Sequence, residues 1–206
     1  RRSLNVPAIL VAEGIGLARC CGVLEAVGIH LPVDAPKRGG LALAVGGVEV
    51  SLLDLTNAYA TLARQGVCRR PRLFVDESSE TIRALKPQTC AAISDILSCR
   101  KRPPAALREG SADNVPWFMW KTGTSSGRRD AWAVGHNYRY AIGVWAGRFR
   151  GTGRLEYVGA QAAEPVLGRL FSLASLRLDS DPPRPEAIRV RKPLALPKEV
   201  AQDVRI

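Results

Sequence analysis

The stretch Trp120-Lys121-Thr122-Gly123-Thr124-Ser125 decides the fold that we expect of this chain. It continues the uncharged, aromatic run 116–119, which is typical of a strand buried on at least one face. In a strand, Thr122 and Thr124 share one face, and Lys121, Gly123 and Ser125 share the other. An isolated glycine inside a strand often marks the close approach of a ligand. The strand therefore offers a cation, two hydroxyls and bare backbone, which suit an extended peptide that ends in a carboxylate.

A second short motif, Ser3-Leu4-Asn5, stands near the other end of the chain. Lys-Thr-Gly consists of common residues that recur by chance, so it needs such a companion. Motifs of the forms S-x-x-K, S-x-N and K-T-G together are the signature of penicillin-binding proteins and class A β-lactamases. Two of the three are present in the family's order. The alternative is that Ser3 or Asn5 simply caps a helix, since Pro7 suits a first helical turn.

Three longer blocks carry a resemblance to a known family. They are RSLNVPA (2–8), GGVEVSLLDLTNAYATLARQG (46–66) and KTGTSSGRRDAWAVGHNYRYAIGVWAGR (121–148). They resemble the transpeptidase domain of class A penicillin-binding proteins, most closely the 1C type, and the resemblance covers most of residues 1–178. It implies an α/β fold of the α+β type, with an antiparallel sheet flanked by helices as in serine β-lactamases. That fold would be incomplete here, because the segment with S-x-x-K is missing.

The resemblance also implies a reaction, acyl transfer from D-alanyl-D-alanine stem peptides during peptidoglycan cross-linking, with β-lactams as inhibitors and no cofactor. Ser3 would move a proton towards the leaving amine, Asn5 would bind the substrate amide, and Lys121 would supply positive potential and keep Ser3 engaged. Thr122 and Thr124 would lie near the terminal carboxylate, and the Thr124 N–H would be one oxyanion donor. Gly123 would let the peptide approach.

The nucleophilic serine of such a reaction is absent. The single S-x-x-K in the chain, Ser98-Cys99-Arg100-Lys101, comes at the end of a predicted helix before two prolines. The family's serine instead opens a buried helix upstream of S-x-N. We therefore expect the chain to be inert alone and to leave apolar faces near Leu17 and Leu55 bare. Upstream segments of the same protein would supply the serine, a glycosyltransferase domain and a membrane anchor, on the periplasmic face of the inner membrane.

Composition narrows the alternatives. The 206 residues include 46% hydrophobic and 24% charged ones, which is ordinary for a globular domain, and the longest apolar stretch, 6–17, is too short to cross a membrane. The net charge of +11 could attract nucleic acid, but the basic residues are scattered in short clusters. We expect no nucleic-acid partner. A non-catalytic module that binds wall peptides or a partner protein remains the alternative function, and a basic nucleic-acid-binding domain is a third.

The cysteines and histidines give no metal site. The five cysteines form no C-x-x-C and have no histidine at ligand spacing. Cys20 and Cys21 are expected to fill an apolar core. An extracytoplasmic location would permit a disulfide elsewhere, although an odd count leaves one thiol without an internal partner. His30 opens a loop that runs through Pro36, and we expect it to be structural.

Hydrophobic periodicity and turn residues predict the order of the elements. Helices are expected over 7–13, 15–27, 86–97 and 160–176, with another between the capping motif Ser51-x-x-Asp54 and Gly66, and strands over 68–75, 118–124, 131–136 and 139–147. Residues 136–139 should form the hairpin turn between the last two strands. We expect one partial domain over 1–178 and a proline-rich linker over 179–206.

Overall fold

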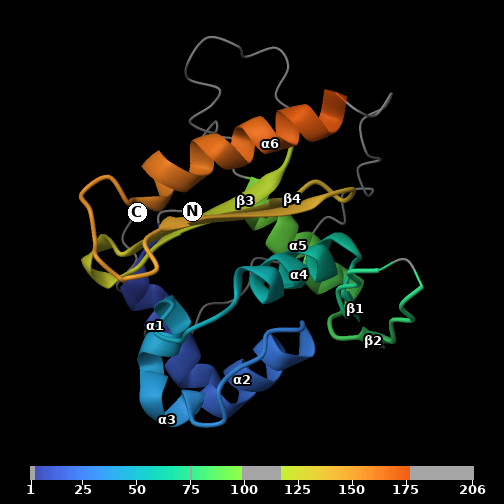
Figure 1. Ribbon diagram of the computed structural model, residues 1–206. Coiled ribbons are helices and arrows are strands. Elements are labelled where there is room, and N and C mark those ends of the chain that lie inside the picture. The colour runs from blue at the N-terminus through green and yellow to red at the C-terminus, as the bar shows by residue number, and fades with distance from the viewer. Residues whose placement is uncertain (1–2, 75, 99–116, 177–206) are drawn as a thin grey trace.

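The centre of the molecule is a three-stranded antiparallel sheet. The computed structural model describes residues 3–74, 76–98 and 117–176. The strands β3 (Met119–Thr124), β4 (Asp130–His136) and β5 (Ala141–Gly147) lie in the order β3-β4-β5 (Figure 1). These are the strands that the alternation predicted, so the antiparallel sheet is confirmed.

Both hairpin turns of the sheet are held by local hydrogen bonds. At the β4–β5 turn, the Asn137 Oδ1 atom accepts from the backbone N–H groups of Arg139 and Tyr140, at 3.2 and 2.9 Å. Asparagine side chains commonly fold back on the chain in this way. At the β3–β4 turn, the Ser125 Oγ atom accepts from the Asp130 N–H at 2.8 Å. The sequence therefore fixes the register of the sheet through its turns.

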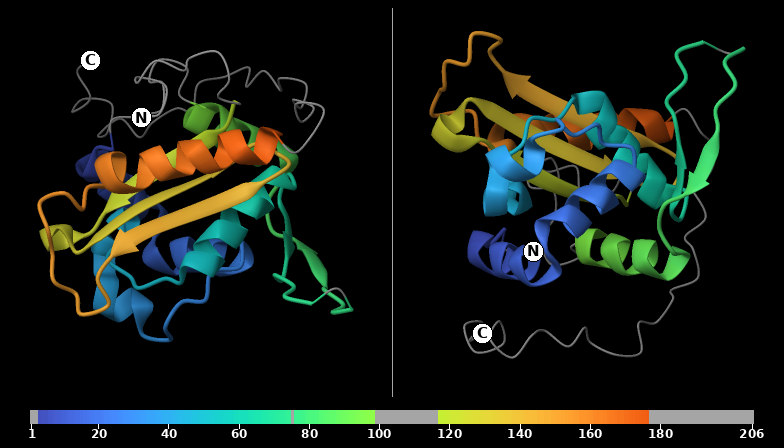
Figure 2. Two further views of the ribbon diagram at one scale, coloured as in Figure 1. Left: turned by 45° about the horizontal axis from the view of Figure 1, so that its top comes forward. Right: turned by 90° about the horizontal axis from the view of Figure 1, so that it is seen from below.

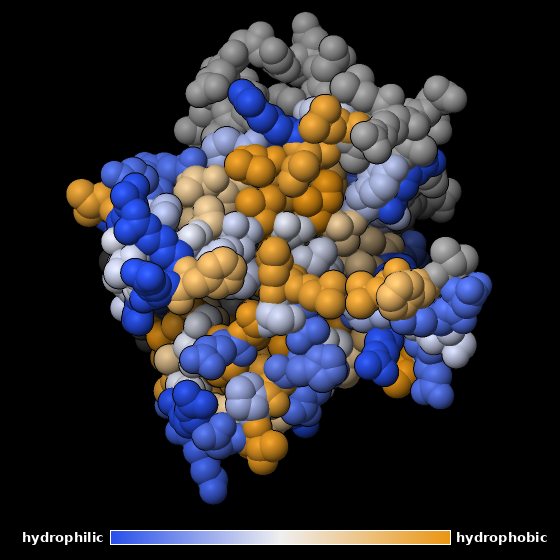
Figure 3. All heavy atoms as spheres, viewed as in Figure 1, coloured by the Kyte–Doolittle hydropathy of each residue, from blue (hydrophilic) through white to orange (hydrophobic). Residues whose placement is uncertain are grey.

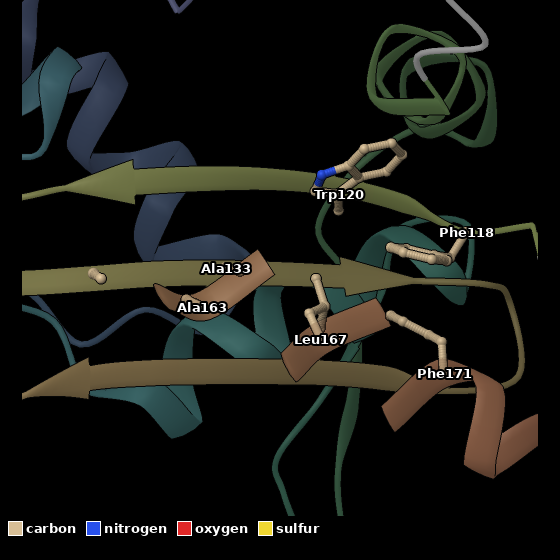
Figure 4. Close-up of a cluster of buried hydrophobic side chains, with 7 residues drawn as sticks. Phe118, Trp120, Ala133, Ala163, Leu167 and Phe171 are labelled. Carbon is tan, nitrogen blue, oxygen red and sulfur yellow. The ribbon is translucent and has the colours of Figure 1, made fainter. Parts of the chain in front are cut away.

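One face of the sheet is covered by a helical segment from the end of the described chain. A π-helical turn, η5 (Gly159–Ala163), leads into α6 (Glu164–Leu176), so the helix expected over 160–176 is confirmed with an irregular first turn. α6 lies over this face of the sheet in the left view of Figure 2. The core between them is formed by Phe118, Trp120, Ala131, Ala133, Ala163, Leu167 and Phe171 (Figure 4). The Phe118 and Phe171 rings stack with centroids 4.3 Å apart, and burying each such ring stabilises the fold by about 1.5–3 kcal/mol.

Helices α4 (Leu52–Ala63) and α5 (Pro87–Ser98) pack on the opposite face. The capping motif is confirmed, because the Ser51 Oγ atom accepts from the Asp54 N–H at 3.0 Å. α4 approaches β5 so closely that a Cβ atom on Gly143 would overlap the Thr56 hydroxyl. A smaller core of Val27, Ile29 and Ala58 joins α4 to the N-terminal helices.

The N-terminal helices form a separate layer below α4 (Figure 1). α1 (Asn5–Ile15) and α2 (Leu17–Ala26) confirm the two expected helices and bend by 98° at Gly16. In the described chain no single helix has the length and apolarity to cross a membrane, and α1 and α2 reach both only as this bent pair. Large apolar side chains stay exposed on this layer, namely Leu4, Val6, Ile15 and Val23, whereas Leu17 and Leu55 are half-buried. Apolar side chains are therefore bare near both predicted positions, at Ile15 and Leu53, although Leu17 and Leu55 themselves are half-buried.

Two local predictions need correction, and one short strand was not predicted. The loop from His30 ends at Asp34, since a short helix, α3 (Ala35–Gly39), and a 3₁₀-helix, η1 (Gly40–Val45), follow. Pro36 favours a loop in the sequence because proline interrupts the interior of a helix, but proline also suits the first turn of a helix, where Pro36 lies. The strand expected over 68–75 is only β1 (Val67–Arg69), and its partner β2 (Thr81–Arg83) was missed. β2 is exposed at all three residues, so it has no apolar alternation to reveal it.

Two predictions fall partly outside the described residues. Cys20, Cys21, Cys68 and Cys90 are free thiols, with Cys21 and Cys90 buried, while Cys99 is not described. The predicted linker 179–206 also lies outside, so the domain boundary near 178 stays a prediction.

Candidate functional site

A large cavity opens between β3 and the helical layers. Its volume is about 1220 Å³, and its walls join segments far apart in the sequence. The lining residues include Asn5 of α1, Arg38 of α3, residues 44–50 at the end of η1 and after it, Leu55 and Tyr59 of α4, residues 121–126 of β3 and its turn, Arg129 of the same turn, Asp130, Trp132 and Val134 of β4, and Gly151. The Lys-Thr-Gly segment and one residue of the Ser-x-Asn motif therefore face a common space.

Lys121 lies on the face of β3 that looks away from α6. Trp120 and Phe118 belong to the α6 core, so strand alternation directs Lys121 to the opposite face of the sheet, on which α4 and α5 pack. Lys121 is half-buried there. The Lys121 Nζ atom donates to the Thr122 carbonyl oxygen at 2.6 Å. This bond holds the ammonium group close to the edge of the strand. Because β3 is an edge strand, this edge pairs with no other strand among the described residues.

Thr124 and Gly123 are exposed at the end of β3. The Thr124 Oγ1 atom accepts from the Gly159 N–H at 3.0 Å, which fixes the hydroxyl and leaves its own hydrogen to donate. A Cβ atom on Gly123 would meet only the Trp132 Cβ at 3.5 Å, an ordinary contact. The fold therefore does not demand glycine at position 123.

The Ser-x-Asn motif does not cap α1. Leu4 is the N-cap residue and no side chain accepts a capping hydrogen bond. Asn5 is the first helical residue and lines the cavity. Ser3 is exposed, with a positive φ of 53°, and is not among the described residues that line the cavity. The structure thus brings Asn5 together with Lys121, but not Ser3.

Ser98 occupies a structural position. It is the last residue of α5 and is buried, and its Oγ atom donates to the Asp95 carbonyl oxygen at 2.8 Å. It lies outside the cavity lining, and Lys101 lies outside the described residues. This placement gives Ser98 no access to a ligand bound at β3.

Several cavity residues carried no sequence signal. Arg38 and Arg129 add cations to the cavity wall, and Glu49 adds an acid. Tyr59 reaches the cavity from α4, and burial raises the pKa of its phenol, so it stays protonated and can donate a hydrogen bond. These residues come from two helices and two connecting segments, and only the tertiary fold assembles them.

The two histidines lie apart from this site. Burial lowers the pKa of His136 to about 4, so it is neutral near pH 7, and its Nε2 atom lies 3.4 Å from the Ser94 Oγ atom. The His30 Nδ1 atom lies 3.0 Å from the Asp54 Oδ2 atom, which joins its loop to α4 in the structural role expected. Among the described residues no cluster of His, Cys, Asp or Glu has the makings of a metal site.

Solved structures with the same arrangement define the class of fold. Penicillin-binding protein 1A from Haemophilus influenzae matches with a TM-score of 0.67 at 16% identity, over 89% of this chain and 34% of that one. A peptidoglycan glycosyltransferase from Burkholderia ambifaria matches with 0.64 at 18% identity, over 88% and 63%. The PonA1 protein from Mycobacterium tuberculosis, solved with penicillin V, matches with 0.58 at 19% identity, over 80% and 51%. The chain therefore has the mixed α/β fold found in penicillin-binding proteins.

Sequence relatives make the assignment narrower. Penicillin-binding protein 1C from Escherichia coli is 34% identical over 189 residues, which cover 91% of this chain and 24% of the relative. Penicillin-binding protein 1A from Aquifex aeolicus is 32% identical over 144 residues, which cover 61% and 19%. No family model matches the chain. The chain is homologous to class A penicillin-binding proteins, and it spans a quarter or less of the length of these relatives.

Proposed function

We propose that this chain is part of a peptidoglycan D,D-transpeptidase domain, within a bifunctional synthase at the periplasmic face of the inner membrane. One observation carries the proposal. Asn5 and the segment Lys121–Thr124, more than a hundred residues apart, line a single cavity beside an edge of β3 that pairs with no strand in the described part of the chain. An extended peptide can add to such an edge through backbone hydrogen bonds, as strand-binding proteins bind theirs.

Each wall of the cavity would then have a task. The edge of β3 would align a stem peptide that ends in D-alanyl-D-alanine. The exposed Thr124 hydroxyl would donate to the terminal carboxylate, with Thr122 beside it and the Lys121 ammonium adding positive potential. Asn5 would bind a substrate amide. Ser3 does not line the cavity in this structure, so it would have to turn towards the cavity to pass a proton to the leaving amine.

The covalent step needs a serine that these residues do not supply. In that step a serine oxygen attacks the carbonyl carbon of the penultimate D-alanine, the C–N bond breaks, and the terminal D-alanine leaves with the proton. An acceptor amine then displaces the serine and completes the cross-link. Since Ser98 is buried at the end of α5, the serine must come from another segment, and removing a nucleophile lowers catalysis on the order of a millionfold.

Labelling with a fluorescent penicillin tests this proposal. The 206-residue chain should form no adduct, whereas a version extended upstream through an S-x-x-K serine should be labelled. In the extended protein Lys121→Ala should lose labelling, and Lys86→Ala, an exposed lysine at the start of α5, should keep it. Labelling of the short chain that disappears in Ser98→Ala would overturn the assignment of the nucleophile.

A non-catalytic module is the second candidate, because the cavity forms without the serine. In that case the extended protein would bind a D-alanyl-D-alanine peptide and yet stay unlabelled at long exposure to penicillin. Adduct formation by the extended protein excludes this candidate.

A further inference from the structure

Five arginines gather at one end of the sheet, beside the cavity. They lie in two segments, the turn after β3 with the 3₁₀-helix η4 (Ser126–Arg128) and the loop after β5, and they are Arg128, Arg129, Arg148, Arg150 and Arg154. All five are exposed. Figure 1 places both segments at the left flank, and Figure 3 shows hydrophilic side chains gathered there. We name this set the arginine rim.

The backbone of the arginine rim is tied together. The Arg154 N–H donates to the Arg128 carbonyl oxygen at 3.1 Å, and the Arg128 Nη1 atom donates to the Leu155 carbonyl oxygen at the same distance. A Cβ atom on Gly153 would overlap the Gly127 carbonyl oxygen, so the two segments touch directly. The arginines are thus presented from one braced surface, not from two independent loops.

The arginine rim carries five positive charges beside two acids that are close in sequence, Asp130 and Glu156. Within the described part of the chain, none of the five arginines forms an ion pair with a carboxylate. The Asp130 carboxylate, the nearest acid in sequence, accepts from the Trp145 indole N–H at 3.0 Å. The Arg150 and Arg154 side chains make no hydrogen bond to described residues. Such guanidinium groups remain available to carboxylates, whose geometry they match in a bidentate manner.

The arginine rim is continuous with the cavity. Arg129 and Gly151 line the cavity together with Thr124 and Ser126 at the end of β3. A peptide laid along the edge of β3 would therefore pass the arginine rim as it leaves the cavity. The cations on this side of the molecule therefore fall into two groups, Lys121 in the cavity and the arginine rim at its end.

We propose that the arginine rim binds a second carboxylate of the peptide, on a side chain away from its C-terminal end. The ligand class is an extended acidic peptide, held at its C-terminus by the strand edge and farther along by Arg150 and Arg154. This inference rests on the proposed function only in that the cavity holds a peptide.

Binding of two matched probes to the 206-residue chain tests the inference without the complication of acylation. Both are fluorescein-labelled pentapeptides that end in D-alanyl-D-alanine, and they differ only in one side-chain carboxylate that is free or amidated. Fluorescence anisotropy should show the free acid binding about two- to fivefold more tightly, the range expected for one exposed ion pair, with the preference shrinking as salt is added. Arg150→Gln with Arg154→Gln should remove the preference. Arg69→Gln with Arg70→Gln, the same charge change on the distant β1–β2 ribbon, should retain it.

Four results would overturn the inference: equal binding of the two peptides, binding of neither, a preference that survives Arg150→Gln with Arg154→Gln, or loss of affinity in that variant for a single-stranded oligonucleotide alone. The last would assign the arginine rim to nucleic acid. Penicillin labelling of the extended protein distinguishes failure of this inference from failure of the proposed function. Labelling with equal peptide binding removes only the inference, whereas absence of labelling removes the proposed function.

Discussion

Replacing Gly123 with alanine separates what the fold needs from what a ligand needs. The new methyl group would lie 3.5 Å from the Trp132 Cβ, an ordinary contact, and Gly123 has no positive φ that would strain alanine. Alanine loses less chain entropy on folding than glycine, by about 0.5–1 kcal/mol. For a chain of this size that corresponds to an increase in Tm of about 1–4 °C.

The same methyl group would stand on the cavity face of β3, where we propose that the peptide backbone approaches. A displacement of about 1 Å at a reacting group can cost on the order of a hundredfold in rate. In the extended protein, Gly123→Ala should therefore slow labelling by fluorescent penicillin by about 10- to 100-fold while the Tm stays level or increases. Stopped samples separated on a gel give the rate, and differential scanning fluorimetry gives the Tm.

Gly143→Ala is the matched control, because its Cβ would overlap the Thr56 hydroxyl on α4. Overpacking of this kind costs about 1–3 kcal/mol, so the Tm should fall while the folded fraction is labelled at the unaltered rate. Labelling of Gly123→Ala at the unaltered rate would refute the argument, since no ligand would then approach the strand at this point. A clear fall in the Tm of Gly123→Ala would show that the fold itself requires glycine at this position.

Three further predictions concern stability. Ser51→Ala removes the hydroxyl that accepts from the Asp54 N–H and should lower the free energy of unfolding by about 0.5–2 kcal/mol in urea titrations. Phe171→Ala empties the centre of the α6 core and should cost about 3–5 kcal/mol, with exposure of the core reported by dye binding. Burial lowers the pKa of His136 to about 4, below the unfolded value of 6.5, so the unfolded state binds more protons than the folded state between these pH values. The free energy of unfolding should therefore be constant above about pH 6.5 and decrease as the pH falls towards 4. His136→Gln should flatten this part of the profile of Tm against pH.

The sheet could be predicted from the sequence because its strands and turns depend on residues that are close together in the chain. Alternation marks the strands, and Asn137 and Ser125 hold turns through hydrogen bonds within a few residues. The ribbon strand β2 could not be predicted, because an exposed strand of three residues buries nothing that would leave an apolar pattern. α3 could not be predicted either, because Pro36 is compatible both with a loop and with the first turn of a helix.

The residues of the candidate site also fall into two groups, those that a sequence motif reveals and those that only the tertiary structure reveals. Lys121 to Thr124 are visible in the sequence because the motif lies within one strand, and their partner Asn5 was found through a second short motif. Tyr59 and Arg129 reach the cavity only because α4 packs on the sheet and the β3–β4 turn folds beside it. No spacing in the sequence encodes such neighbours, so they become visible only with the tertiary structure.

The division of β3 between two faces links stability to the proposed chemistry. Phe118 and Trp120 are buried against α6, and this burial fixes the register that turns Lys121 towards the cavity. The Thr124 hydroxyl, on the α6 side, is oriented by the Gly159 N–H at the start of the helical segment that covers the same core. A change that slips the strand by one residue would therefore bury a lysine and expose an aromatic ring at once. The apolar core and the charged edge are selected together, since neither arrangement is available to β3 without the other.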